Sequence, residues 1–191
     1  MGERVYTKYR QLYAKAHETL DDWSSAQVLT LALISSAANV ITRLPSFVKD
    51  ENFDIFVDDA EVIEAIRANQ MQSLEVTLQR LQEQLPKFQH KCSSLEKIVQ
   101  DGRHLCKEAS PLPSHGGERR GAVPSLIECQ EGLEDIWRMH QDDYKLKAAM
   151  IACLRWDMTE DELGQIQTLV RAQPTVDPEK LRLLIALQRA G

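Results

Sequence analysis

The residues most able to do chemistry lie in one short stretch, LEDIWRMHQDDYKLK, at positions 133–147. It combines a tryptophan, a histidine, a tyrosine and four acids within fifteen residues. If the stretch is helical, Asp143 and Tyr144 follow His140 by three and four residues, so the three side chains can touch. A carboxylate beside an imidazole is a common acid–base arrangement, which makes the stretch the first candidate for a catalytic site.

The same stretch also fits a second interpretation, in which it forms a packing face. On a helix one stripe carries most of its large side chains, while Glu134 and Asp142 fall to the other side. The members of the stripe are Leu133, Ile136, Trp137, His140, Tyr144 and Lys147. Tryptophan and tyrosine supply large contact areas with one polar end, which suits a protein–protein contact. Because no other segment offers residues that would converge on a catalytic centre, we interpret the stripe as a candidate partner-binding face.

Motifs for metal binding and nucleophilic catalysis are missing elsewhere in the sequence. His90-Lys-Cys92 and His104-Leu-Cys106 look like a repeated ligand pair, but residues two apart on a helix point in nearly opposite directions. A di-iron bundle needs Glu-x-x-His on each of two helices, whereas the nearest match, Asp101-x-x-His104, occurs once. There is no phosphate-binding glycine loop and no serine nucleophile motif. The sequence therefore predicts no catalytic residue, no metal and no cofactor.

The elements that must position these residues are helices, because the only sustained hydrophobic period is helical. Alternating steps of four and three residues from Val5 to Leu44 meet apolar side chains at nine or ten of twelve positions. The same steps from Met71 to Cys106 meet them at ten of eleven. Such a repeat predicts two long helices with a coiled-coil-like seam.

Prolines and capping residues predict where the helices begin and end. Pro45 is expected to end the first helix, and Pro86 to kink the second near Gln82 without ending it. Three further helices have N-terminal signatures, of which the first two are capping boxes and the third is a proline at the first helical position. These signatures are Ser125 with Glu128, Thr159 with Glu162, and Asp177 followed by Pro178. The first of these helices is expected to end near Leu154.

The predicted fold is therefore all-α: an elongated bundle of three long helices with coiled-coil-like packing, plus a short C-terminal helical pair. We expect residues 1–191 to form a single helical domain. Residues 45–59 are predicted to be an acidic link that folds over the bundle. Residues 110–123 contain two prolines and three glycines without periodicity, which predicts a mobile loop.

The charge of the chain is concentrated in one segment. The whole chain has a formal net charge of −6, which argues against a general nucleic-acid binder. Between Lys49 and Glu64, seven acids stand against one lysine. The acids are Asp50, Glu51, Asp54, Asp58, Asp59, Glu61 and Glu64. They form a candidate acidic patch for a basic partner, although a solvated loop explains them equally well.

The sequence also indicates a compartment. The charged N-terminus has no apolar signal region, and the apolar run from Val28 to Ile41 is shorter than the ~20 residues of a membrane span. The four cysteines form no CxxC pair, and a chain without a signal peptide is expected to keep its thiols in a reducing compartment. We expect a cytoplasmic and nuclear protein without membrane contact or direct sequence-specific nucleic-acid binding.

Several helical positions resemble those of a known family. They are Leu133, Asp135, Ile136, Arg138, Tyr144, Lys147 and, nine residues further on, Trp156. The acidic Phe/Asp-rich link after Leu44 and the segment LEKIVQDGRHL at 95–105 are similar too. The pattern resembles the AAA-ATPase-interacting ribosome maturation factor family, formerly described as casein-kinase-2 substrates. Around Met139 to Lys147 it also resembles the cyclin-dependent-kinase-2-interacting protein.

The resemblance implies a non-enzymatic subunit. Such a protein would pair with a second helical-bundle subunit on an AAA ATPase hexamer, and would act indirectly on pre-ribosomal particles during late maturation of the large ribosomal subunit. It also adds Trp156 to the candidate partner-binding residues. The alternative is a coiled-coil scaffold of another nuclear or cytoskeletal complex, and a helical-bundle metalloenzyme is a distant third.

Overall fold

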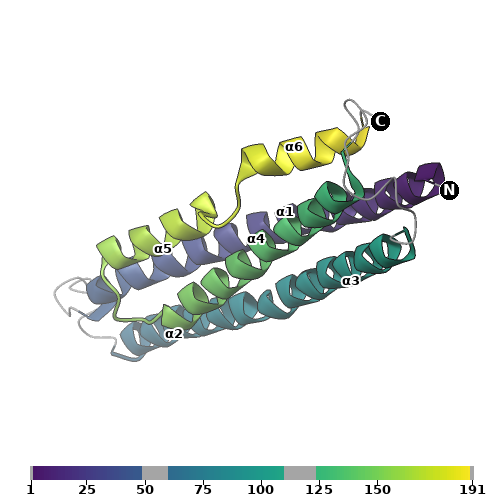
Figure 1. Cartoon of the computed structure of the whole chain (residues 1–191). Helices are drawn as coiled ribbons and strands as arrows, with labels where there is room; N and C mark the ends of the chain where they lie inside the picture. The colour runs from purple at the N-terminus through teal and green to yellow at the C-terminus, as the bar shows by residue number, and fades with distance from the viewer. Residues whose placement is uncertain (1, 49–59, 110–123, 190–191) are drawn as a thin grey trace. The chain divides into compact units, whose positions relative to one another are not determined.

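The computed structural model describes residues 2–48, 60–109 and 124–189, and the regular elements in these ranges are all α-helices (Figure 1). In chain order they are α1 (Gly2–Val48), α2 (Ala60–Gln82), α3 (Leu85–Ala109), α4 (Leu126–Cys153), α5 (Glu160–Ala172) and α6 (Pro178–Arg189). The described ranges contain no strand, so the predicted all-α class is confirmed.

The helices group into two compact units. Unit 1 comprises Met1–Ser25, Lys87–Lys145 and Pro174–Gly191, and unit 2 comprises Ala26–Pro86 and Leu146–Gln173. Helices α1 and α4 each contribute one part to unit 1 and another to unit 2. The expectation of a single helical domain stays a prediction.

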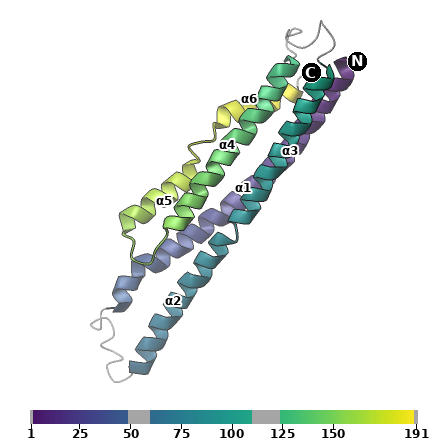
Figure 2. The same ribbon diagram turned by 60° about the horizontal axis from the view of Figure 1, so that its bottom comes forward.

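Unit 1 packs the first half of α1 against α3, α4 and α6. Its buried core is made of Tyr9, Leu12, Tyr13, Ala16, Leu20, Leu95, Ile98, Val99, Leu105, Leu126, Cys129, Leu133 and Ile136. Figure 2 shows α6 beside α4, where Lys180 Nζ lies 2.8 Å from Asp135 Oδ2. The partly buried Leu181, Leu184 and Ile185 of α6 add to this core.

Unit 2 packs the second half of α1 against α2, the end of α4 and α5. Its buried core is made of Ile34, Ala37, Ala38, Val40, Ile41, Leu44, Leu74, Leu81, Ile151, Leu154, Leu163, Ile166 and Val170. The Gln27 amide on α1 donates to the Val170 carbonyl of α5 at 2.6 Å, which fixes α5 against α1.

The hydrophobic repeat correctly predicts which side of α1 is buried. All twelve positions of the four-and-three pattern from Val5 to Leu44 are buried or half-buried. In the second repeat, Met71 is the exception, with 37% of its surface exposed. The repeat works because residues three and four apart share one face of a helix.

The predicted end of the first helix at Pro45 is wrong, because α1 continues to Val48. A proline inside a helix removes one hydrogen bond and crowds the preceding turn. Pro45 is exposed and only three helical residues follow it, so the disruption is confined to the last turn. Arg67 of α2 donates from Nε to the Phe47 carbonyl at 2.6 Å, which satisfies one acceptor in this last turn.

The second long helix is bent close to Gln82, where the sequence predicted a kink, and it is also interrupted there. Helix α2 ends at Gln82, a turn covers Glu83 and Gln84, and α3 begins at Leu85. The Gln84 amide bonds to the Leu81 carbonyl at 3.1 Å, which tightens the turn. Pro86 then lies in the first turn of α3, where its missing N–H removes no intrahelical hydrogen bond. The apolar repeat continues across the break, so the periodicity alone suggested one helix.

The predicted N-terminal signatures are confirmed. Ser125 and Glu128 exchange hydrogen bonds of 2.8 and 3.2 Å at the start of α4. Thr159 caps α5 in the same way, and the Asp177 carboxylate accepts from two amides in the first turn of α6. Helix α4 ends at Cys153, beside the predicted Leu154. The predicted loop at 110–123 and residues 49–59 of the acidic link lie outside the described residues.

Candidate interaction surfaces

The stripe on α4 lies mostly inside the protein. Four of its six members, Leu133, Ile136, His140 and Lys147, are buried, with at most 3% of their surface exposed. Trp137 and Tyr144 are half-buried. Burial gives the four enclosed side chains a packing role within the chain. Within this stripe, Trp137 and Tyr144 are the residues that remain partly accessible to a partner.

His140 is held in an aromatic cluster. Its ring lies edge-on to Trp23 of α1, with centroids 4.9 Å apart at 90°, and Trp23 meets Phe88 of α3 at 4.7 Å. His140 Nδ1 lies 2.8 Å from the Ile136 carbonyl. Because a carbonyl only accepts, Nδ1 carries the proton. The cluster joins three helices, which is a structural role for the histidine.

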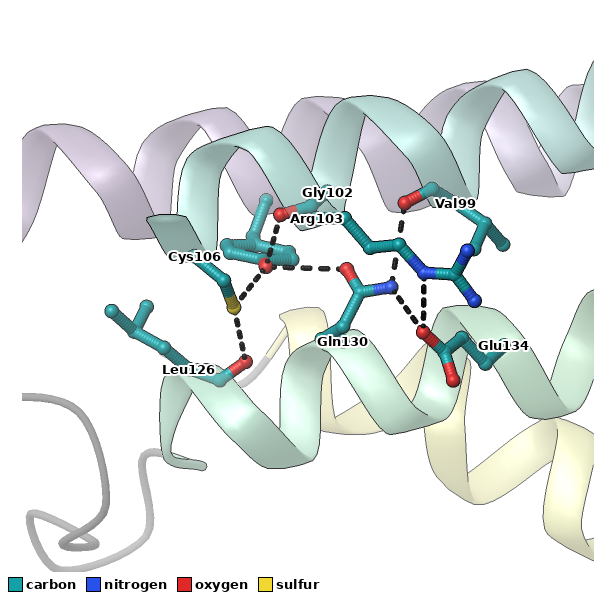
Figure 3. A network of polar contacts seen from close by, with 8 residues as sticks. Val99, Gly102, Arg103, Cys106, Leu126, Gln130 and Glu134 are labelled. Atoms are coloured by element: carbon teal, nitrogen blue, oxygen red, sulfur yellow. Dashed lines mark hydrogen bonds and ion pairs between the residues drawn. The ribbon is translucent and has the colours of Figure 1, made fainter. Parts of the chain in front are cut away.

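A second group of residues joins the same three helices through polar contacts (Figure 3). The Tyr9 hydroxyl on α1 donates to the Gly102 carbonyl at 2.8 Å and lies 2.9 Å from Cys106 Sγ, both on α3. Gln130 of α4 donates from Nε2 to the Val99 carbonyl at 3.3 Å. Buried polar groups that find partners in this way fix one arrangement of helices over others.

The outer edge of this network is charged. Glu134 on α4 accepts from Gln130 Nε2 at 2.8 Å and from Arg103 Nε at 2.9 Å. The hydrogen bond from Gln130, followed by that from Arg103, lowers the pKa of the Glu134 carboxyl below its usual value. The carboxylate therefore stays ionised, and it ties α3 to α4 at the boundary between core and solvent (Figure 3).

Sequence reasoning missed this network. The hydrophobic repeat left Gly102 as its one exception, and the structure explains why. A Cβ at residue 102 would collide with Gln130 Oε1 and lie 3.2 Å from Leu133 Cδ1. The sequence offered two signals for this network: a glycine within the heptad repeat, and a glutamine followed four residues later by a glutamate. Only the packed helices show which residues meet.

The two buried tyrosines predict how stability depends on pH. Burial, followed by the hydrogen bond with Cys106, raises the pKa of Tyr9 above 10.0, and burial raises that of Tyr13. The unfolded chain therefore releases these protons at lower pH than the folded protein. The two protonated tyrosines therefore contribute their full stabilisation of the folded protein below pH 10. This contribution is lost as the pH rises above 10.

Above pH 10, the free energy of unfolding should fall with rising pH. We expect Tyr9→Phe and Tyr13→Phe each to reduce the steepness of this fall by up to about 1.4 kcal/mol per pH unit. Urea unfolding between pH 9 and 11.5 measures the slope. Each phenylalanine variant also loses a hydrogen bond, but that cost is the same at every pH. An unchanged slope in both variants would contradict the assignment.

Among the described residues, metal ligands do not gather in one place, and one hollow on the surface is small. No group of three or more His, Cys, Asp or Glu side chains among them could hold a metal ion. A shallow hollow of about 230 Å³ lies beside Gln100, Arg103, His104 and Lys107. All four residues come from α3, and the hollow is smaller than ordinary ligand pockets of roughly 300–1,000 Å³.

Trp156 is the exposed member of the candidate partner-binding residues. It lies between α4 and α5, and 64% of its surface is exposed. Its neighbours Arg155 and Asp157 pair at 3.0 Å. Helix α5 begins directly after this turn, with three acids in its first turn. A large exposed aromatic side chain therefore precedes, by four to six residues along the chain, a group of three acids.

The start of α5 is itself held by a capping box. Thr159 N–H donates to the Glu162 carboxylate at 2.8 Å, and Glu162 N–H donates back to the Thr159 hydroxyl at 3.3 Å. The backbone hydrogen bond, followed by the side-chain one, lowers the pKa of Glu162. The cap therefore fixes the chain direction just after Trp156.

The acidic patch is only partly described. Glu61 and Glu64 are exposed on the first turns of α2. The other five acids, Asp50, Glu51, Asp54, Asp58 and Asp59, lie outside the described residues.

Comparison with protein families decides what kind of molecule this is. The family model of C1orf109-like ribosome biogenesis proteins matches residues 3–187, nearly the whole chain. The chain belongs to this family. A comparison with curated proteins gives no significant match.

The match agrees with the resemblance on the main point. The C1orf109-like proteins are the ribosome maturation family that the α4 positions resembled, and theirs is not a known family of enzymes. The description as casein-kinase substrates and the likeness to the cyclin-dependent-kinase-2-interacting protein are not confirmed. A role in ribosome biogenesis follows from membership.

Proposed function

We propose that this protein is a non-enzymatic adaptor subunit of an AAA-ATPase assembly that acts in late maturation of the large ribosomal subunit. The observation that carries the proposal is the family match over residues 3–187. In this role the chain pairs with a second helical-bundle subunit, and together they bind an AAA ATPase hexamer. The ATPase supplies the energy for releasing and recycling an assembly factor. We place the protein in the cytoplasm and the nucleus.

The chemistry of the chain supports an adaptor. The sequence has no phosphate-binding loop, which agrees with ATP hydrolysis by a partner. Among the described residues, His140 and Cys92 are enclosed in packed helices. What the described surface offers instead is side chains suited to contact, among which Trp156 is the largest.

We assign Trp156 as an anchor for a partner. Tryptophan is enriched at the centres of protein interfaces because it buries a large area with few rotatable bonds. The acids that follow it at the start of α5 favour a partner pocket that is apolar inside and basic at the rim. Raising the salt concentration should weaken this contact, because ions screen the rim charges.

Affinity purification of the tagged chain from cell extract tests the function. We expect mass spectrometry to identify an AAA ATPase and a second helical-bundle subunit in stoichiometric amounts. A purification that recovers neither, or that recovers cytoskeletal or chromatin subunits instead, would overturn the adaptor proposal.

The same purification with Trp156→Ala tests the anchor. We expect recovery of the ATPase to fall at least tenfold, because an interface hot spot contributes about 2 kcal/mol or more. Leu183→Ala is the matched control, since Leu183 is also 64% exposed but lies on α6. If Trp156→Ala recovers as much ATPase as the control does, Trp156 is not the anchor.

A further inference from the structure

Helix α6 lies on the surface of α1 and α4 and is not enclosed by them. Its apolar side chains Leu181, Leu184 and Ile185 pack against the core of unit 1, but all three are only half-buried. Among residues 178–186, the part of α6 whose burial the structure describes, no side chain is fully buried. A helix that buries so little surface can detach at a lower free energy than the helices that form the core.

The contacts beneath α6 match one helix to one face. We call this face the α6-binding face; the residues that lie beside α6 and the segment before it are Tyr13, Gly132, Asp135 and Met139. Leu184 Cδ2 lies 2.9 Å from the position that a Cβ would take at Gly132, so the glycine makes room for the leucine. Lys180 Nζ pairs with Asp135 Oδ2 at 2.8 Å (Figure 2). A missing side chain opposite a leucine and an acid opposite a lysine select the sequence of α6.

The connection between α5 and α6 is short and contains a strained residue. Helix α5 ends at Ala172 and α6 begins at Pro178, so residues 173–177 join them. Gln173 has φ 43° and ψ 60°, in the left-handed region that non-glycine residues rarely adopt. It also precedes Pro174, and the residue before a proline favours an extended backbone. Placing α6 on its own chain therefore holds Gln173 in an unfavourable conformation.

We propose that two copies of this chain exchange α6, so that the α6-binding face of each copy holds the α6 of the other. The occupant is the helix that already lies on this face, supplied by a second copy. Every contact of α6 is kept, because the exchanged helix is identical. What changes is the connection: residues 173–177 can extend over up to about 17 Å, which releases Gln173 from the left-handed region. Short connections under strain favour exchange of this kind.

The protein concentration decides between the two forms. In the monomer, a short connection keeps α6 at an effective concentration of about 1 mM for its own face. The strain at Gln173 opposes this closure, and the exchanged dimer relieves the strain twice, once in each copy. We therefore expect the dimer at protein concentrations below about 1 mM. This inference does not depend on the proposed function.

Two substitutions of Gln173 test the role of the connection. Glycine adopts the left-handed region without strain, so Gln173→Gly stabilises the closed monomer. We expect the dissociation constant of the dimer, measured by sedimentation equilibrium on the full chain, to rise roughly tenfold or more, because the dimer then has less strain to relieve. Gln173→Ala is the matched control. It also removes the glutamine side chain but keeps a Cβ and the strain, so its dissociation constant should stay within about threefold of the wild-type value.

Charge reversal tests whether α6 is the exchanged element. Asp135→Lys and Lys180→Asp each place like charges opposite one another, both in the monomer and in a dimer of that variant alone. In an exchanged dimer of the two variants, both faces bring opposite charges together again. Asp135 also lies 3.4 Å from Arg138, but that pair is within α4 and is not altered by exchange.

Native mass spectrometry of the two full-length variants, mixed in equal amounts, measures the three possible dimers. We expect the mixed dimer to form about fivefold more readily than either dimer of one variant, because two opposite-charge pairs replace two like-charge pairs. Both variants should melt within about 3 °C of the wild type, since the pair is at the surface. If one of them melts lower, the Gln173 pair, which leaves the α6-binding face unchanged, decides the question.

Three results would overturn the inference. The first is a wild-type chain that stays monomeric up to about 1 mM. The second is a dimer that Gln173→Gly weakens no more than Gln173→Ala does, and the third is a mixture of charge-reversed variants without a preference for the mixed dimer. In the last two cases the two copies meet through another surface. None of these results bears on the adaptor function, which the affinity purification tests separately.

Discussion

Trp23→Ala is expected to lower the free energy of unfolding by about 3–5 kcal/mol, the range for truncating a large buried aromatic side chain. Trp23 is 2% exposed. It contacts Phe88 of α3 and His140 of α4, so its loss leaves a cavity where three helices meet. For a chain of 191 residues, this corresponds to a melting temperature roughly 6–20 °C lower.

Thermal and urea unfolding of purified Trp23→Ala measure the effect, and Trp156→Ala is its matched control. The same substitution at the exposed Trp156 should change stability by less than about 0.5 kcal/mol. The two tryptophans therefore have opposite expected phenotypes: one maintains the fold, and the other binds a partner. Equal destabilisation by both variants would refute the burial on which the assignments rest.

Gly132→Ala should also destabilise unit 1, by roughly 2 kcal/mol. A Cβ at residue 132 of α4 would collide with the Tyr13 hydroxyl and lie 2.9 Å from Leu184 Cδ2 of α6. The tyrosine ring is rigid, and its hydroxyl donates to the Cys129 carbonyl at 2.9 Å, so moving it breaks a buried hydrogen bond. Overpacking of this kind costs about 1–3 kcal/mol, and lost hydrogen bonding adds to it.

Gly164→Ala is the control for the effect of alanine on a helix. Apart from the adjoining residues and backbone of α5 itself, no atom lies within 4 Å of the position that a Cβ would take at Gly164. Alanine should therefore stabilise α5 by up to about 1 kcal/mol, because it restricts the unfolded chain and favours the helix. Thermal melts should move in opposite directions for the two variants. A Gly132→Ala protein that melts at or above the wild-type temperature would contradict the close packing of α1, α4 and α6.

The stretch at 133–147 shows how a chemical pattern can be a packing pattern. Its histidine, tryptophan and leucine side chains do contact other helices, as the amphipathic stripe predicted. For Leu133 and His140, however, those helices belong to the same chain: Leu133 lies in the core of unit 1, and His140 meets Trp23 of α1. A stripe that packs inside the protein has the same helical period in the sequence as a stripe that binds a partner. Only the burial of its side chains in the structure distinguishes the two.

Local features of the sequence determine where most helices begin. The capping boxes at Ser125 and Thr159 and the Asp177–Pro178 pair mark the starts of α4, α5 and α6, because a cap bonds to amides only two or three residues away. The apolar repeat in α1 likewise determines its buried side, since a helix has a fixed period. The sequence determined the effect of the prolines less well. Helix α1 passes Pro45, and its last turn is held by Arg67 of α2, a contact that the local sequence does not predict. The chain breaks at Glu83 and Gln84, just before Pro86, close to the predicted kink.

Only the tertiary structure decides which surfaces remain for a partner. The network of Tyr9, Gly102 and Gln130 draws residues from three helices, separated by up to 121 positions along the chain. The exposure of Val28 and Trp156 depends equally on which helices lie beside them. Whether a side chain is buried depends on the residues that surround it. On other helices these residues are determined by tertiary packing and not by the helical period of the local sequence.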